Sequence, residues 1–177
     1  SKQNYVLQIK NVVADKGYSE IIMPLIEDIL NECQLNINQL TAFLVCTGPG
    51  NYTSLRIAIS IVRGLSLACK KPACGISLFE LLSTTENEIL VLIKGPREKL
   101  YVQNFSNGVQ INAPRLMTLN EITNTTEFYG LKTIGYKAKE VGKLLNCSNY
   151  LEAPEISFEK FFALGINKLK KSCPRPA

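Results

Sequence analysis

The sequence predicts an α/β protein of two lobes, in which mixed sheets are flanked by helices, on three observations. Hydrophobic residues make up 46% and charged residues 20% of the 177 residues, as is typical of a folded globular chain. Residues 43–80 alternate β-rich runs with a long apolar helical pattern, as parallel strands joined by a helix do. After residue 86, short β-rich runs separated by glycine-containing turns indicate an antiparallel meander and therefore a second lobe.

We expect the first lobe to span residues 1–85 and the second residues 86–156, with a C-terminal helix at 157–177 that packs back on the first lobe. A chain of this length can bury one sizeable core or two small ones. Each lobe is expected to start with antiparallel strands and to continue with helix–strand pairs. The organisation is therefore a loose internal repeat.

The first lobe begins with two short β-rich runs, residues 5–9 and 12–15, which we expect to pair as a hairpin. Ser19 can cap a helix over residues 20–33. Pro24 lies near the first turn of this helix, where a missing N–H costs least.

A strand–loop–helix–strand unit follows. Strands are expected at residues 43–46 and 73–76, parallel to each other, and Asn51 or Thr53 can cap the helix that runs to about Cys69 between them. A last short helix spans residues 78–83. In the second lobe, strands are expected at residues 88–94, 100–105, 109–112 and 131–135, and helices after Thr118, at 137–145 and from Ser157.

Both long helices of the first lobe carry more apolar surface than one buried stripe requires. On the second helix the polar residues form one narrow stripe, and the rest of its surface is apolar. The two helices therefore either pack on each other inside the monomer or form an interface with another chain. For the interface we predict the contact residues Ile22, Leu25, Ile59 and Arg63.

The loop before the second helix, residues 47–50, contains two glycines and invites a phosphate-binding interpretation. It does not fit a P-loop, because no lysine follows Thr53, and it lacks the third glycine and the acidic residue of a dinucleotide site. Pro49 also removes one N–H from any anion nest. We therefore interpret the loop as a structural motif that brings the helix against the sheet, formed by Gly48, Pro49, Gly50, Thr53 and Arg56.

Composition narrows the possible chemistry. The chain contains no histidine, which removes Ser–His and Cys–His nucleophile pairs and histidine metal sites, so no catalytic, metal or cofactor residues are predicted. Its six cysteines are expected to be reduced thiols.

Without a membrane-length apolar run or a signal sequence, we expect a cytoplasmic protein. Residues 89–177 hold 13 Lys and Arg against 7 Asp and Glu, so the second half of the chain is basic. A basic half can indicate nucleic-acid binding, but lysines scattered over solvated helices are the commoner cause.

Several segments together resemble the bacterial TsaB (YeaZ) family. They are Ser19-Glu20 before the first helix, residues 48–57 (GPGNYTSLRI), Lys71-Pro72, and residues 75–77. Where this chain has Tyr18-Ser19-Glu20, the family pattern has His-Ser-Glu. In place of residues 48–57, the family pattern has GPGSFTGLRIG. Tyr18 stands where the family has histidine, and Asn51, Tyr52 and Ser54 depart from the loop pattern. The family's opening strand and closing segment are not found in residues 1–177, so the sheet of the first lobe is expected to be short of an inner strand.

The resemblance implies the two-lobed actin-like (ASKHA, RNase H-like) superfold. It also implies a non-catalytic scaffold or activating subunit that binds TsaD, which places the threonylcarbamoyl group on the adenosine next to the anticodon in tRNA. TsaE would join the same assembly, tRNA would be contacted only indirectly, and a homodimer could form through the same helices when TsaD is absent. The alternative is an ATPase or small-molecule kinase of the same superfold, which would need an acidic residue beside the phosphates.

Overall fold

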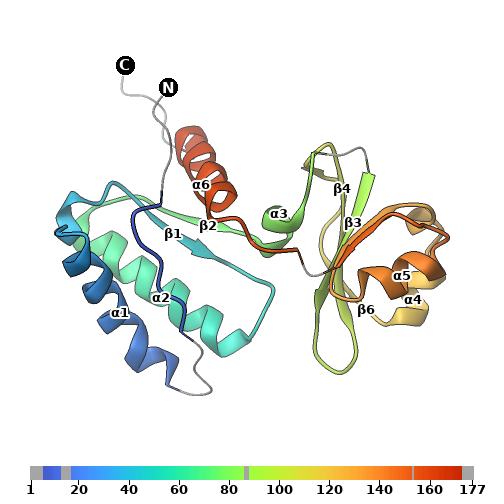
Figure 1. Ribbon diagram of the computed structural model, residues 1–177, viewed down its shortest axis with the longest axis horizontal. Helices are drawn as coiled ribbons and strands as arrows, with labels where there is room; N and C mark the ends of the chain where they lie inside the picture. Colours follow the sequence, from blue (N-terminus) through green and yellow to red (C-terminus); the bar gives the residue numbers. More distant parts are fainter. Residues whose placement is uncertain (1–5, 13–16, 86–87, 153, 173–177) are drawn as a thin grey trace. The chain divides into compact units, whose positions relative to one another are not determined.

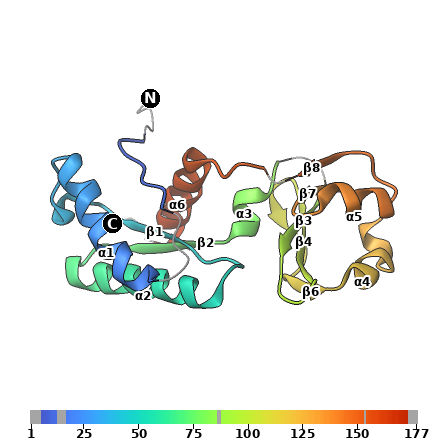
Figure 2. The ribbon, with the colours of Figure 1, turned by 60° about the horizontal axis from the view of Figure 1, so that its bottom comes forward.

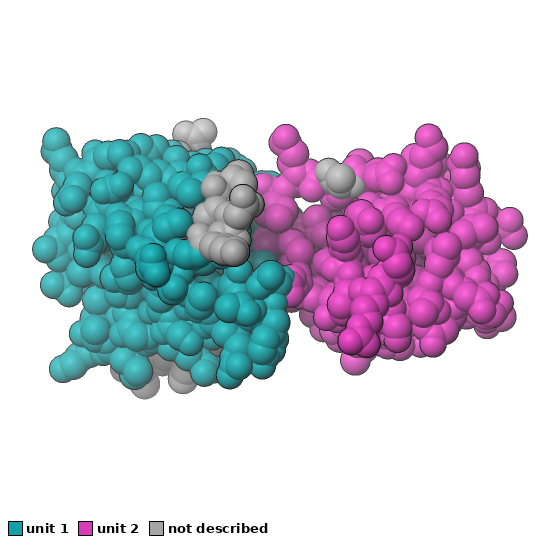
Figure 3. All heavy atoms as spheres, turned by 90° about the horizontal axis from the view of Figure 1, so that it is seen from below, with its two compact units in different colours: residues 1–47, 51–76, 157–177 teal, residues 48–50, 77–156 magenta. Residues whose placement is uncertain are grey.

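The computed structural model describes residues 6–12, 17–85, 88–152 and 154–172 (Figure 1). The chain divides into two compact units, coloured separately in Figure 3. Unit 1 comprises residues 1–47, 51–76 and 157–177, and unit 2 comprises residues 48–50 and 77–156. The division along the chain precedes helix α3 (Leu78–Leu82), whereas the sequence placed it after this helix, because α3 packs on strand β3 (Glu88–Lys94).

Unit 1 is built on a two-stranded parallel sheet of β1 (Phe43–Cys46) and β2 (Ala73–Ile76), paired from Phe43 with Ala73 to Cys46 with Ile76. Helix α2 (Tyr52–Cys69) covers one face of this sheet, and α1 (Tyr18–Glu32) packs against α2. Helix α6 (Phe158–Ser172) contacts β2 from the other face (Figures 1 and 2). A short 3₁₀ turn, η1 (Ile37–Gln39), precedes β1. The strand–helix–strand prediction for this region is confirmed.

Two expectations for the N-terminal region were wrong. Residues 6–12 form no strand, so the hairpin is absent from the described part of this segment, and residues 5 and 13–15 lie outside it. Helix α1 begins after Gly17, at φ 82°, without a side-chain cap, and Ser19 lies inside its first turn. Pro24 consequently lies in the second turn rather than the first, where it removes one intrahelical hydrogen bond.

Unit 2 contains a six-stranded mixed sheet in the order β5-β4-β3-β7-β8, with β6 paired to β4. Strands β3, β7 and β8 are parallel, and β4, β5 and β6 are antiparallel to their neighbours. The remaining strands are β4 (Leu100–Ser106), β5 (Val109–Gln110), β6 (Arg115–Met117), β7 (Lys132–Gly135) and β8 (Tyr150–Glu152). The remaining helices are α4 (Leu119–Thr123), η2 (Thr126–Phe128) and α5 (Ala138–Leu144).

Alternating side chains of β3 supply two cores, one on each face of this sheet. Leu90 and Leu92 pack with residues of α4, η2 and α5, whereas Ile89 and Val91 pack with Phe79 of α3. A strand buried on both faces reads as a continuous apolar run, which is why residues 88–94 were placed correctly from the sequence. Thr118 and Glu121 form the capping box predicted for α4. The short exposed strand β8 has no such signal and was missed.

Candidate partner interface

Helices α1 and α2 leave their apolar side chains incompletely covered. The structure describes every residue of both helices, and none of them is buried. Ile22, Leu25 and Ile59 are half-buried, and Arg63 is exposed. The four predicted contact residues therefore keep surface that a partner could cover, and Arg63 is the one among them that is exposed.

The exposed stripe of α2 has a feature that sequence reasoning missed. Arg56, Ser60 and Arg63 lie on it as expected, and Leu67 continues the same spacing toward the C-terminal end. Leu67 is 80% exposed, and Tyr52 at the start of the helix is 70% exposed. The signal was present in the sequence, because a leucine in a polar stripe faces solvent in an isolated chain.

The loop before α2 is hydrogen-bonded to the start of α3. Gly48 is buried at φ 83°, and its carbonyl accepts a hydrogen bond from the N–H of Leu78 at 2.7 Å and one from the Ser77 hydroxyl at 3.4 Å. The Gly48–Pro49 peptide bond is cis, and Gly50 is exposed. An L-residue at position 48 would be strained at this φ.

Asn51, rather than Thr53, caps α2, because its side-chain oxygen accepts from the backbone N–H of Ser54 at 3.1 Å. Thr53 lies in the first turn with its side chain exposed. The Arg56 guanidinium lies over the Tyr52 ring, 5.0 Å from its centroid. The motif residues Thr53 and Arg56 thus belong to the solvent-facing start of α2.

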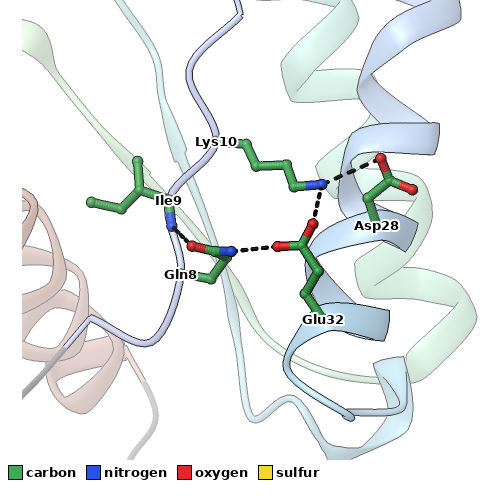
Figure 4. Close-up of polar contacts among 5 residues, drawn as sticks. All are labelled: Gln8, Ile9, Lys10, Asp28 and Glu32. Carbon is green, nitrogen blue, oxygen red and sulfur yellow. Dashed lines mark hydrogen bonds and ion pairs between the residues drawn. The ribbon is translucent and has the colours of Figure 1, made fainter.

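Residues 8–10 are tied to α1 by a small polar network, shown in Figure 4. The Lys10 ammonium contacts Glu32 at 2.7 Å and Asp28 at 3.3 Å, and the Gln8 amide donates to the other oxygen of Glu32 (Figure 4). The hydrogen bonds from Lys10 and then from Gln8 lower the pKa of Glu32, and the bond to Glu32 raises the pKa of Lys10. This network links the segment to α1 through exposed side chains.

Beside this segment lies an apolar groove with a volume of about 480 Å³. Its walls come from the N-terminal segment, α1, β1 and α6, all within unit 1. The lining side chains include Val6, Ile9, Ile29, Leu44, Phe158, Phe161, Phe162, Ile166 and Leu169. Unit 1 therefore has uncovered apolar side chains next to α6, in addition to those of α1 and α2.

Other site chemistry is sparse in the part of the chain that the structure describes. It holds no group of three or more His, Cys, Asp or Glu residues arranged to bind a metal. Cys33, Cys46, Cys69, Cys74 and Cys147 are free thiols, and Cys173 lies outside the described residues. Among the described helices, none is both long and apolar enough to cross a lipid bilayer. The arrangement of α1 and α2 can dock an apolar partner surface edged with carboxylates, which would pair with Arg56 and Arg63.

Comparison with known proteins places the chain in a family. The family model described as "TsaD: tRNA N6-adenosine threonylcarbamoyltransferase" matches residues 9–170. The tRNA threonylcarbamoyladenosine biosynthesis protein TsaB of Buchnera aphidicola (subsp. Acyrthosiphon pisum, strain APS) is 28% identical over 99 residues, which are 52% of this chain and 45% of that protein. The tRNA N6-adenosine threonylcarbamoyltransferase of Protochlamydia amoebophila (strain UWE25) is 32% identical over 68 residues, which are 38% of this chain and 20% of that protein. The chain thus spans less than half the length of either curated relative.

The solved structure of YeaZ from Pseudomonas aeruginosa has the same fold, with a TM-score of 0.68 over 88% of this chain and 79% of that one, at 17% identity. The predicted α/β class, with mixed sheets flanked by helices in an actin-like fold, is confirmed. The match of the family model over residues 9–170 shows that the chain belongs to the family of the tRNA N6-adenosine threonylcarbamoyltransferases, and the TsaB-named relative and the YeaZ fold are those of a TsaB (YeaZ) type member.

Proposed function

We propose that this chain is a non-catalytic subunit of an assembly that threonylcarbamoylates the adenosine next to the anticodon in tRNA, and that it binds a TsaD-type transferase through α1 and α2. One observation carries the proposal: two apolar helices of 15 and 18 residues contain no buried residue. The names of the relatives support the pathway, and the absence of histidine from the sequence supports an accessory role. The isolated chain is expected to show no ATPase, peptidase or tRNA-modifying turnover.

The physical basis is the uncovered area on these helices. A helix that is apolar around most of its circumference needs cover on two sides, and unit 1 supplies a two-stranded sheet on one side of α2. Helix α1 packs against α2, Ile22, Leu25 and Ile59 are half-buried, and Leu67 adds an exposed apolar side chain to α2. A partner that contributes two helices of its own would form a four-helix contact and complete their burial.

The same surface would also serve a second copy of this chain. Because both contacts need α1 and α2, binding of the transferase and formation of a homodimer should exclude each other. A TsaE-type protein would join the complex of the first two. Transferase should therefore convert any homodimer into a heterodimer.

The test is size-exclusion chromatography with light scattering, on the chain alone and mixed with the TsaD-type transferase of the same organism. The main variant is Leu67→Glu, since this side chain is 80% exposed and can be changed without opening a core. Leu144→Glu is the matched control, because Leu144 is a 48% exposed leucine on a helix of unit 2. Ile22→Asp, Ile59→Asp and Arg63→Glu extend the test across the predicted contact.

A charge placed in a desolvated contact without a partner costs about 3–5 kcal/mol, which is more than a 100-fold loss of affinity. We expect Leu67→Glu to remain folded by circular dichroism and to elute apart from the transferase, while the Leu144→Glu control co-elutes. If both variants and the Ile22 and Ile59 variants co-elute normally, α1 and α2 do not form the interface and the proposal is wrong.

A further inference from the structure

A small basic pocket lies at the carboxyl ends of two parallel strands of unit 2. Leu92 of β3 pairs with Gly135 of β7, so the residues that follow, Lys94 on one strand and Tyr136 on the other, emerge at the same edge. The hairpin of residues 95–99 closes a third side. The pocket is lined by Lys94, Gly95, Glu98, Lys99, Leu100, Leu119, Tyr136 and Lys137, all within unit 2.

Three lysines from three separate segments converge on this pocket. Lys94 ends β3, Lys99 precedes β4, and Lys137 precedes α5. Among the residues that the structure describes, no carboxylate lies within ion-pair distance of Lys94 or Lys99, whereas Lys137 pairs with Glu140 at 3.4 Å. Glu98 is the one acidic residue that lines the pocket. Two further carboxylates lie near the lysines, because Glu140 pairs with Lys137 and Lys99 acts electrostatically on Glu121. The positive charge that a phosphate could meet therefore comes from individual ammonium groups, chiefly that of Lys94, and not from a net charge of the pocket.

The walls of the pocket are held by backbone bonds. The N–H of Gly95 donates to the Lys99 carbonyl at 2.9 Å, and the N–H of Tyr136 donates to the Leu92 carbonyl at 2.9 Å. Arg97, Glu98 and Lys137 all adopt positive φ, at 50°, 59° and 57°. Arg97 and Glu98 are the central residues of the turn closed by the bond from the Lys99 N–H to the Pro96 carbonyl at 3.1 Å, and a hairpin turn of this type has positive φ at both positions.

Tyr136 adds an aromatic surface to the basic cluster. Tyr136 is 39% exposed, and the Lys94 ammonium lies 5.6 Å from its ring centroid. Lysine is a compact cation that binds phosphate as a point charge, and an exposed tyrosine ring can stack on a nucleobase. Proteins that bind single-stranded RNA commonly place aromatic side chains next to basic ones.

The size of the pocket decides between a nucleotide and an RNA backbone. Its volume is about 30 Å³, whereas sites that enclose a small molecule measure about 300–1,000 Å³. The pocket can accept part of one phosphate group but cannot enclose a nucleoside. A polyanion that places one phosphate in the pocket, beside the Lys94 ammonium, and continues over the surface fits the volume.

We propose that Lys94, Lys99, Lys137 and Tyr136 form a contact site for the phosphodiester backbone of RNA, with an unpaired base against the Tyr136 ring. The proposal rests on the proposed function in tRNA modification and deepens it. The family resemblance implies that tRNA is contacted only indirectly, whereas this site would contact the RNA directly. The site lies in unit 2 and uses no residue of α1 or α2.

The experiment measures the affinity of the 177-residue chain for a labelled, unmodified tRNA transcript between about 50 and 200 mM NaCl, because each lost phosphate contact changes the slope of log affinity against log salt. The test variant combines Lys94→Gln, Lys99→Gln and Lys137→Gln. The matched control combines Lys143→Gln, Lys170→Gln and Lys171→Gln, which remove the same charge from exposed helix positions. Circular dichroism confirms that both proteins fold.

Each pocket lysine that contacts a phosphate should contribute about 0.7–0.9 to the slope, so the test variant should lose about 2 and the control much less. Tyr136→Leu should lower the affinity about tenfold with the slope unchanged, as the loss of stacking does. An equal loss of slope in both triple variants, or no RNA binding by the original chain at about 50 mM NaCl, overturns the proposal.

Two further measurements distinguish an RNA contact from a nucleotide site and from the transferase interface. ATP and inorganic phosphate at millimolar concentration should compete weakly and to the same extent, whereas tight, saturable ATP binding lost in the test variant would identify a nucleotide site and overturn the proposal. Co-elution with the transferase should be unaffected by the lysine changes. If co-elution fails for the original chain while the RNA slopes behave as expected, the proposed function falls and the RNA site stands.

Discussion

Unit 1 and unit 2 contain similar apolar side chains but bury them to different degrees. In unit 2, Ile89, Leu90, Val91 and Leu92 are all 0% exposed, because helices cover both faces of a six-stranded sheet. In unit 1, α1 and α2 contain no buried residue over the whole of their described length. Apolar composition therefore does not produce a core unless there is enough sheet for the helices to pack against.

The sheet of unit 1 explains the shortfall. Two strands of four residues are marginal as an independent structure, and they offer α2 and α6 little surface. The apolar groove of about 480 Å³ lies between β1, α6 and the N-terminal segment. Stability within unit 1 should therefore be lower than within unit 2, and more dependent on what binds to it.

The largest expected effect comes from a pair of glycine substitutions, one in each unit. In Gly135→Ala, the new Cβ would lie 2.1 Å from the Leu92 carbonyl oxygen, at φ 112°, so the strands β3 and β7 must separate. In Gly165→Ala, the new Cβ would meet the flexible end of the Leu44 side chain at 2.4 Å, beside the groove. We expect Gly135→Ala to cost more than about 3 kcal/mol, and Gly165→Ala about 1–3 kcal/mol.

Urea unfolding followed by hydrogen exchange of peptides from each unit measures both costs. If the two glycine variants lose equal stability, unit 1 is as tightly packed as unit 2 and the comparison does not hold.

Leucine truncations should show the same difference in stability between the two units, with smaller effects. Leu92→Ala removes a side chain that is 0% exposed and leaves a cavity, at a cost of about 2–5 kcal/mol. Leu65→Ala removes a half-buried side chain of α2, and its cost should be about 1 kcal/mol. The urea midpoint of each variant measures the effect. A cost for Leu65→Ala as large as that for Leu92→Ala would mean that α2 belongs to a closed core in solution.

Partner binding should reduce the difference between the units. In the chain alone, we expect the backbone amides of α1 and α2 to exchange hydrogen faster than those of β3. The reason is that α1 and α2 contain no buried residue, whereas most residues of β3 are buried. Added transferase should slow exchange in α1 and α2 about tenfold or more and leave β3 unchanged. Mass spectrometry of peptides from both units measures this. Slowing in unit 2 with none in unit 1 would place the interface elsewhere.

The smallest expected effect concerns two glutamates, one in each unit. Hydrogen bonds from Lys10 and then Gln8 lower the pKa of Glu32 below 4.5, and the backbone N–H and then the hydroxyl of Thr118 lower that of Glu121. Because both pKa values are lower in the folded state, each carboxylate contributes stability above its unfolded pKa, and that contribution is lost as pH falls through the folded pKa.

Glu32→Ala and Glu121→Ala should therefore each weaken the acid dependence of the urea midpoint between about pH 3 and 6. About 1 M NaCl should reduce the effect of Glu32, which is an exposed ion pair, more than that of Glu121, which caps a helix. An equal response to salt would show that Lys10 does not hold Glu32 in solution.

Local patterns determined much of this protein. The continuous apolar run of β3, the capping box of Thr118 and Glu121, and the strands on either side of α2 were predicted because each is fixed by neighbours along the chain. The N-terminal hairpin was predicted wrongly, since a strand needs a partner to supply its hydrogen bonds and residues 6–12 have none that forms a ladder.

The sequence alone determined the fold class, the order of the central elements and the excess of apolar surface on two helices. Tertiary structure alone decided where that excess lies, since the exposure of Leu67 depends on what packs beside α2. It also brought Lys94, Lys99, Lys137 and Tyr136 together, because the parallel pairing of β3 with β7 joins residues that are far apart in the chain. Periodicity reports which residues share a face of one element, but only the packing of elements determines which faces are covered and which side chains meet.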